Sequence, residues 1–165
     1  MRSGMSSTVL LVRHARAGDK DHWEGDDMAR PLDREGAHQA KLLVDMLGGF
    51  GVTDVLSSPA LRCRQTVEPL AQEAGTAVVA DDRLREERAG DAFELAAELG
   101  RRDGCSAVLC THGDVIPAVL RRIRADHHLE LPQVLRCAKG GTWVLRSERG
   151  RFLSADYLEA PSAAG

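Results

Sequence analysis

The sequence predicts an α/β protein: a three-layer α/β/α sandwich with a mostly parallel sheet and an antiparallel C-terminal hairpin. Two observations lead to this prediction. Short apolar segments rich in β-branched residues alternate with amphipathic segments along most of the chain, and such alternation is typical of parallel sheets covered by helices on both faces. The last two strand-like segments, residues 141–147 and 151–158, flank Glu148-Arg149-Gly150, which indicates a hairpin.

The first strand is expected over residues 8–13, because this segment is short, apolar and β-branched. The polar stretch 18–32 that follows is too long for a minimal connection, which favours a functional loop. Asp33 is a suitable N-cap for a helix over 34–47, and Gly48 marks the end of that helix.

A second strand is expected over residues 52–57. Ser58-Pro59 then opens a second helix, in which a proline near the first turn removes no hydrogen bond. This helix is expected to end near Gly75, and Pro69 inside it should kink or shorten it.

The second half of the chain continues the alternation. The expected strands are 77–80 and 106–111, and the expected helices are 91–102 and 114–125.

The chain has 165 residues, about the length of one domain. Residues 1–7 are small and polar, so we expect a flexible tail there. No internal repeat or shift in composition divides the remainder, which predicts a single domain over residues 8–160.

Composition limits the partners. The formal net charge is −3, which argues against a protein dedicated to nucleic-acid polymers or acidic membranes. The longest strongly apolar run, residues 9–12, is too short to cross a bilayer. The four cysteines show no CxxC spacing, so we expect reduced thiols and a cytoplasmic protein.

Unusual side chains stand at the ends of three predicted strands. The first strand ends in Arg13-His14, the second is followed by Ser58 and by Arg62 in the next helix, and the strand 106–111 leads into His112-Gly113. Because ligands bind at the carboxyl ends of strands in such sheets, we expect these residues to share one site.

Their chemistry suits phosphoryl transfer. Guanidinium groups match two phosphate oxygens at once, and the helix N-termini behind Ser58 and Gly113 add N–H donors. A neutral imidazole is a nucleophile, and a second, protonated imidazole adds positive charge. The pattern therefore predicts phosphoryl transfer through a phosphohistidine.

Four segments carry a resemblance to a known family. They are Leu11-Val12-Arg13-His14-Ala15-Arg16-Ala17-Gly18, Ser57-Ser58-Pro59-Ala60-Leu61-Arg62-Cys63-Arg64-Gln65-Thr66, Arg83-Leu84-Arg85-Glu86 with Gly90, and Thr111-His112-Gly113. Together they resemble the motifs of the histidine phosphatase superfamily, also called phosphoglycerate-mutase-like, which includes the short SixA-type enzymes. A closer likeness, to the phosphatase half of bacterial two-domain Nudix–histidine-phosphatase enzymes, rests on the segments 30–33, 68–71, 115–117 and 139–145.

The resemblance implies residue roles. His14 matches the nucleophile, Arg13, Arg62 and His112 match the groups that hold the phosphoryl oxygens, and Glu86 matches the proton donor. Glu87, the neighbour of Glu86, and Asp114 remain alternative donors.

Some positions depart from the family pattern. Ala15 replaces the usual Gly after the nucleophile, Arg16 and Ala17 replace an acidic residue and Thr, and Lys20 stands where many members have a phosphate-binding Asn. Lysine can contact phosphate as a point charge, so Lys20 is a candidate substrate contact, with an ordinary loop lysine as the alternative.

Several other features have a structural explanation. The acidic residues between 19 and 27 lack the spacing of a calcium loop, and His127-His128 has no partner at ligand spacing, so no metal or cofactor is expected. Trp23 either anchors its loop or stacks on a substrate. Cys63 and Cys110 adjoin the expected site and are taken as packing residues.

We therefore expect a metal-independent phosphohydrolase that acts on a phosphate ester or nucleotide through phospho-His14. The alternative is a SixA-like protein phosphohistidine phosphatase. A phosphoglycerate mutase is less favoured, because the short interval between Glu86 and His112 leaves no room for a substrate-enclosing insertion. A non-catalytic phosphate-binding module is also less favoured, because the residues of the expected site are intact.

Overall fold

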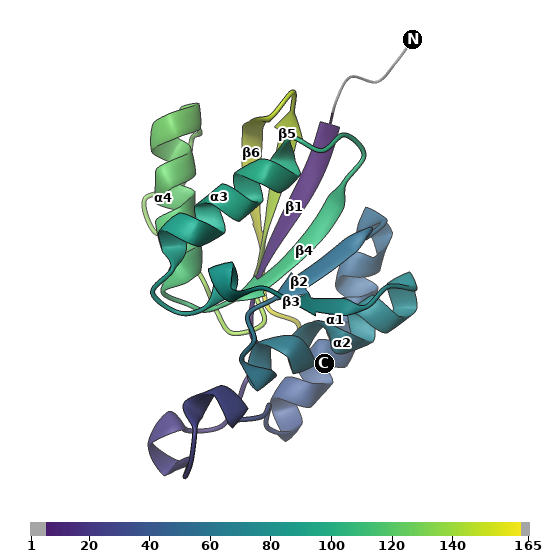
Figure 1. Ribbon diagram of the computed structural model, residues 1–165, viewed down its shortest axis with the longest axis vertical. Helices are drawn as coiled ribbons and strands as arrows, with labels where there is room; N and C mark the ends of the chain where they lie inside the picture. Colours follow the sequence, from purple (N-terminus) through teal and green to yellow (C-terminus); the bar gives the residue numbers. More distant parts are fainter. Residues whose placement is uncertain (1–5, 163–165) are drawn as a thin grey trace.

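A six-stranded sheet with strand order β3-β2-β4-β1-β5-β6 lies at the centre of the computed structural model, which describes residues 6–162 (Figure 1). The strands are β1 (Ser6–Arg13), β2 (Asp54–Ser57), β3 (Val78–Ala80), β4 (Ser106–Thr111), β5 (Thr142–Glu148) and β6 (Arg151–Leu158). Strands β3, β2, β4 and β1 pair in parallel, whereas β5 is antiparallel to both β1 and β6. The predicted mixed sheet with a C-terminal hairpin is confirmed.

Helices cover both faces of the sheet (Figure 1). The four α-helices are α1 (Arg34–Leu47), α2 (Leu61–Ala74), α3 (Ala89–Gly100) and α4 (Val115–His127). Helices α1 and α2 pack against one apolar cluster and α3 and α4 against another. The predicted three-layer sandwich is therefore confirmed.

Alternation along β1 shows why both faces are covered. Leu10 and Val12 belong to the cluster under α1 and α2, while Val9 and Leu11 belong to the cluster under α3 and α4. Successive side chains of a strand point to opposite faces, so a strand that is apolar throughout needs helices on both sides.

One local prediction was wrong, and one alternative for Pro69 does not occur. Ser6 and Ser7, assigned to the flexible tail, belong to β1, where they pair with Glu148 and Ser147. The rest of the predicted tail, residues 1–5, lies outside the described residues. Pro69 does not shorten α2, which continues to Ala74, so the predicted end near Gly75 is confirmed. Leu70 and Ala71 beyond the proline are buried, and this packing offsets the missing backbone hydrogen bond.

Other boundaries moved by a few residues. Helix α3 begins at Ala89 rather than at residue 91, and α4 continues to His127 rather than ending near residue 125.

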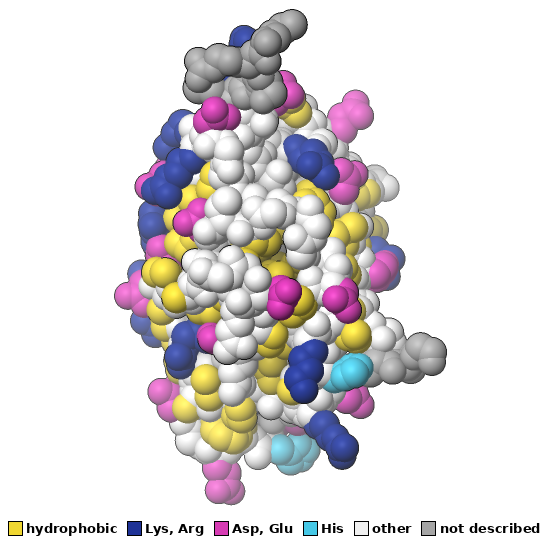
Figure 2. Space-filling view, turned by 90° about the vertical axis from the view of Figure 1, so that its right-hand side faces the viewer, with side chains coloured by type: hydrophobic (Ala, Val, Ile, Leu, Met, Phe, Trp, Pro, Cys, Tyr) yellow, Lys and Arg dark blue, Asp and Glu magenta, His cyan; other side chains and the backbone are white. Residues whose placement is uncertain are grey.

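Among residues 6–162, no helix has both the length and the apolar character needed to span a bilayer. Figure 2 shows basic and acidic side chains interspersed over one face of the molecule.

Candidate active site

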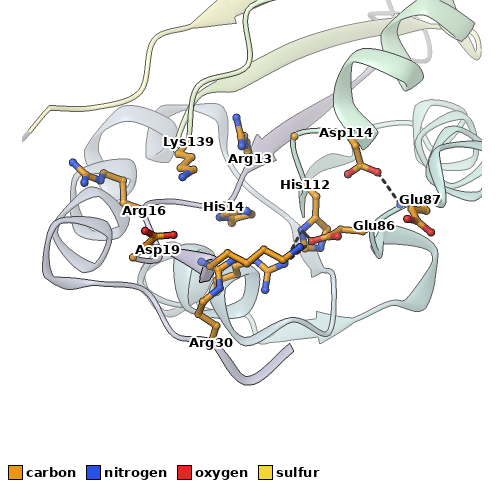
Figure 3. A pocket seen from close by; sticks show the side chains of 14 residues that line it. Arg13, His14, Arg16, Asp19, Arg30, Glu86, Glu87, His112, Asp114 and Lys139 are labelled. Atoms are coloured by element: carbon orange, nitrogen blue, oxygen red, sulfur yellow. Dashed lines mark hydrogen bonds and ion pairs between the residues drawn. The ribbon is translucent and has the colours of Figure 1, made fainter. Parts of the chain in front are cut away.

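Three parallel strands end at the same edge of the sheet. Strand β4 lies between β1 and β2, so the residues that follow these strands, His14, Ser58 and His112, are brought together. The cleft at this edge has a volume of about 800 Å³. It is lined by 14 residues, among which are all the predicted site residues: Arg13, His14, Lys20, Arg62, Glu86, His112 and Gly113 (Figure 3).

His14 is held as a neutral imidazole. Its Nδ1 lies 2.9 Å from the carbonyl oxygen of Ala15, which only accepts hydrogen bonds, so Nδ1 carries the proton and Nε2 keeps a free electron pair. Burial, reinforced by the charges of Arg62, His112 and Arg13, lowers the pKa of His14 from 6.5 to about 3, although the bond to Ala15 opposes this change. His14 is therefore a neutral imidazole at neutral pH, with its one proton on Nδ1.

The backbone beside His14 is fixed by side chains from α2 and by helix α1. The Ala15 N–H donates to Thr66 Oγ1 at 2.9 Å. A Cβ atom on Gly36 in the first turn of α1 would lie 1.8 Å from the carbonyl oxygen of Arg16. Only glycine therefore permits this close approach of α1 to the loop that follows the nucleophile strand.

Two neighbours, the Cys137 carbonyl group and Gly113, determine where the Arg13 side chain lies. One NH1 hydrogen is donated to the carbonyl oxygen of Cys137 at 2.6 Å, while its buried Nε has no partner among the described residues. A Cβ atom on Gly113 would lie 2.6 Å from the Arg13 Cζ atom. Gly113 therefore leaves the space that the guanidinium group occupies.

Arg62, Glu86 and His112 form a second group in the cleft. The Arg62 side chain is 1% exposed, and its NH2 donates to Glu86 Oε1 at 2.6 Å. Glu86 Oε1 also lies 3.4 Å from Nδ1 of His112. The rings of His112 and His14 are 5.5 Å apart in an edge-to-face arrangement, so the carboxylate and both imidazoles face one space.

The far side of His112 contacts Ser58 and Cys63. His112 Nε2 lies 2.9 Å from Ser58 Oγ and 3.6 Å from Cys63 Sγ. Burial alone would raise the pKa of the Cys63 thiol, but hydrogen bonds to Cys110 and His112 outweigh burial and hold this pKa below its ordinary value. Both thiols are fully buried, in agreement with packing residues.

The three carboxylates that the sequence left as alternative proton donors have different contacts in the structure. Glu86 contacts Arg62 and His112 directly. Asp114 instead accepts the backbone N–H of Glu87 at 2.8 Å (Figure 3). Glu87 has a φ of 65°, a conformation that costs energy for a residue other than glycine. Asp114 therefore helps to hold the turn that presents Glu86. Asp114 stands just before α4, but its side chain does not cap that helix.

The polar loop 18–32 lines part of the cleft through Gly18, Asp19, Lys20 and Arg30 and contains two short 3₁₀ helices, Lys20–His22 and Asp27–Ala29. Asp33 ties its two ends together, because its carboxylate accepts the N–H groups of Gly18 and Gly36 at 3.0 and 2.7 Å. The Trp23 indole N–H donates to the Asp26 carbonyl oxygen, which supports the interpretation of Trp23 as a loop anchor.

Sequence reasoning missed four residues of this region, Arg16, Asp27, Arg30 and Lys139. Arg16, Arg30 and Lys139 line the cleft. The Arg16 side chain forms an ion pair with Glu35, a residue that does not line the cleft. Arg30 is buried, donates to Ala17 and pairs with Asp27. Arg30 and Lys139 lie in the segments 30–33 and 139–145, which carry the closer family likeness. That likeness was the sequence feature that could have identified these two residues as part of the site.

The part of the chain that the structure describes contains no group of three or more His, Cys, Asp or Glu residues arranged to hold a metal ion.

Comparison with known proteins agrees with this arrangement. The sequence profile of the histidine phosphatase superfamily (branch 1) matches residues 9–103, which is more than half of the chain. This chain belongs to the histidine phosphatase superfamily. The expected membership is thereby confirmed.

The 8-oxo-(d)GTP phosphatase of Mycolicibacterium smegmatis is 39% identical over 160 residues, which cover 94% of this chain and 49% of that protein. The chain thus spans about half the length of this curated relative.

Solved structures of histidine phosphatases share the fold. The protein histidine phosphatase SixA in complex with tungstate aligns with a TM-score of 0.69 at 18% identity, over 94% of this chain and 96% of that one. Phosphoglycerate mutase from Plasmodium falciparum aligns with a TM-score of 0.64 at 18% identity, over 98% and 95% of the two chains. The fold is therefore phosphoglycerate-mutase-like, as expected.

Proposed function

We propose that this chain is a metal-independent phosphohydrolase that cleaves a phosphate ester or nucleotide through a covalent phospho-His14 intermediate. One observation carries the proposal. The unprotonated Nε2 of His14 shares a cleft with the guanidinium groups of two arginines, Arg13 and Arg62. Guanidinium groups match two phosphate oxygens at once, so a phosphoryl group bound beside His14 would supply acceptors for both arginines.

The proposed reaction has two steps. In the first, His14 Nε2 attacks phosphorus in line, a P–N bond forms, and the P–O bond to the leaving group breaks as Glu86 gives its proton to the leaving oxygen. In the second, Glu86 takes a proton from water, whose oxygen attacks phosphorus. The P–N bond breaks, inorganic phosphate leaves, and His14 returns to its neutral state.

The charge on the phosphoryl oxygens is stabilised by the surrounding groups. Arg13, Arg62 and His112 are proposed to hold these oxygens, because all three face the cleft beside His14. Such transition states depend mainly on positioning and on fixed positive charge. Lys20 and the backbone of Gly113 line the same cleft and are proposed as further substrate contacts.

The position of Glu86 favours esters and nucleotides. An alkoxide is a poor leaving group and needs a proton in the transition state, whereas the imidazole of a phosphohistidine leaves more readily. Glu86 is 45% exposed and lies 3.4 Å from His112, where it can meet a leaving oxygen. The likeness to a nucleotide phosphatase over 94% of this chain supports the same substrate class.

The second candidate is a protein phosphohistidine phosphatase. The structural likeness to SixA favours it, together with the absence of a long insertion between Glu86 and His112 that would enclose a small substrate. We propose a cytoplasmic protein that acts on a phosphorylated small molecule, nucleotide or phosphohistidine protein, and not on nucleic-acid polymers or membranes.

The deciding experiment measures phosphate release from nucleotides, sugar phosphates and a phosphohistidine protein. His14→Ala should abolish turnover of every substrate while the circular dichroism spectrum is preserved, and His38→Ala, an exposed histidine of α1, should have no effect. Exhaustive chelation should leave activity intact. Turnover by His14→Ala within tenfold of wild type would reject the proposal.

A further inference from the structure

Arg62 is oriented by two carboxylates rather than one. Its NH2 lies 2.6 Å from Glu86 Oε1 and 3.1 Å from Asp27 Oδ2. Its NH1 donates to the backbone carbonyl oxygen of Asp27 at 2.9 Å. Asp27 therefore contacts both terminal nitrogens of the guanidinium group, although it lies 35 residues away along the chain. The Nε atom is left without a partner among the described residues.

The two carboxylates differ in how firmly they are held. Asp27 is fixed by Arg30, whose Nε donates to Asp27 Oδ1 at 3.1 Å and whose NH1 donates to the Ala17 carbonyl oxygen at 2.7 Å. Arg30 is itself only 8% exposed. No other hydrogen bond in the described chain fixes the Glu86 carboxylate besides its contacts with Arg62 and His112. Asp27 is thus the permanent partner of Arg62.

The buried positive charge of Arg62 explains why a fixed carboxylate partner is needed. A guanidinium group that is almost fully buried requires a fixed counter-charge. Glu86 cannot provide it throughout the proposed reaction, because its carboxylate must also exchange a proton with the leaving group. Burial alone would raise the pKa of Asp27, but the hydrogen bond from Arg30 and the charges of Arg62 and Arg30 outweigh burial and lower this pKa. Asp27 therefore carries its charge at neutral pH.

We propose that Asp27 is a positioning residue that holds the Arg62 guanidinium group in place at the cleft beside His112 while Glu86 transfers a proton. This inference rests on the proposed function. The loop 18–32 then has a defined role, because it places the Asp27 carboxylate beside Arg62 of α2. Asp27 itself does not contact the substrate in this scheme.

A double-mutant cycle tests the proposal. Asp27→Asn is made in the wild type and in Arg62→Met, which removes the charge but keeps a long buried side chain. Hydrolysis of p-nitrophenyl phosphate is measured at high enzyme concentration. Misplacing a catalytic group by about 1 Å can cost about 10²-fold in rate, so we expect Asp27→Asn to lower kcat/KM by about 10- to 100-fold in the wild type and less than about twofold in Arg62→Met.

The control is Asp21→Asn, an exposed aspartate of the same loop, which should leave kcat/KM unchanged. A general role for Asp27 in folding the loop would instead give equal losses in both backgrounds, and that result would overturn the proposal. No loss in the wild-type background would overturn it as well.

Binding of inorganic phosphate, measured by calorimetry, separates this proposal from the proposed function. Asp27→Asn should weaken phosphate binding in the wild type but not in Arg62→Met, whether or not the protein turns over a substrate. If His14→Ala retains turnover, the proposed function fails while the binding cycle still decides the role of Asp27. Equal binding by wild type and Asp27→Asn would reject the positioning role.

Discussion

The buried neutral imidazole of His14 contributes to the pH dependence of the stability of this protein, and one substitution should remove that contribution. The pKa of His14 is about 3 in the folded protein, against 6.5 for an ordinary histidine. Between these values the unfolded chain binds a proton that the folded protein does not bind, so stability falls as the pH falls below 6.5. Asn at position 14 cannot titrate, and its amide can still donate to the Ala15 carbonyl.

The magnitude follows from the two pKa values. At pH 5.5 the unfolded histidine is about one pH unit below its pKa, while the folded one is still unprotonated. Each such unit corresponds to about 1.4 kcal/mol. Between pH 7.5 and 5.5 the wild type should therefore lose about 1.4 kcal/mol more stability than His14→Asn loses.

Urea unfolding at pH 5.5 and pH 7.5 measures the difference directly, because titrations common to both proteins cancel when the two pH dependences are subtracted. His38→Asn, which removes an exposed histidine, should keep the wild-type dependence. The same pH dependence in wild type and His14→Asn would show that His14 gains a proton as readily in the folded state as in the unfolded state. The assignment of a neutral nucleophile would then be wrong.

Three further predictions concern neighbouring residues. Glu86→Gln should slow hydrolysis of alkyl phosphates by about 10²- to 10⁴-fold but hydrolysis of p-nitrophenyl phosphate only slightly; an equal loss across leaving groups of different pKa would exclude Glu86 as the acid. Gly113→Ala should lower kcat/KM by about 10²-fold, since its Cβ would lie 2.6 Å from Arg13 Cζ, and unchanged kinetics would show that the guanidinium position is not critical. Asp33→Ala removes acceptors for the N–H groups of Gly18 and Gly36 and should destabilise the protein by about 1–2 kcal/mol, measured by urea unfolding; a smaller loss would show that water replaces the cap.

The sequence by itself determined the layers of the fold and the centre of the site. Strand and helix periods are local properties, so they could be recognised without the tertiary structure. Arg13, His14 and His112 stand at the carboxyl ends of two parallel strands, and these ends must meet at one edge of the sheet. The predicted end of α2 near Gly75 is confirmed, and Pro69 does not shorten the helix, because the buried residues beyond the proline keep the helix against the sheet.

Only the tertiary structure decided which polar side chains support these central residues. Asp27 meets Arg62 because the loop 18–32 folds back over α2, and Asp114 meets the Glu87 N–H because β4 and the turn 85–88 end side by side. The Arg16 side chain, next but one to the nucleophile, turns instead to Glu35. Hydrogen bonds between such residues depend on the path of the backbone through space, which neither the hydrophobic period nor the spacing of motifs encodes.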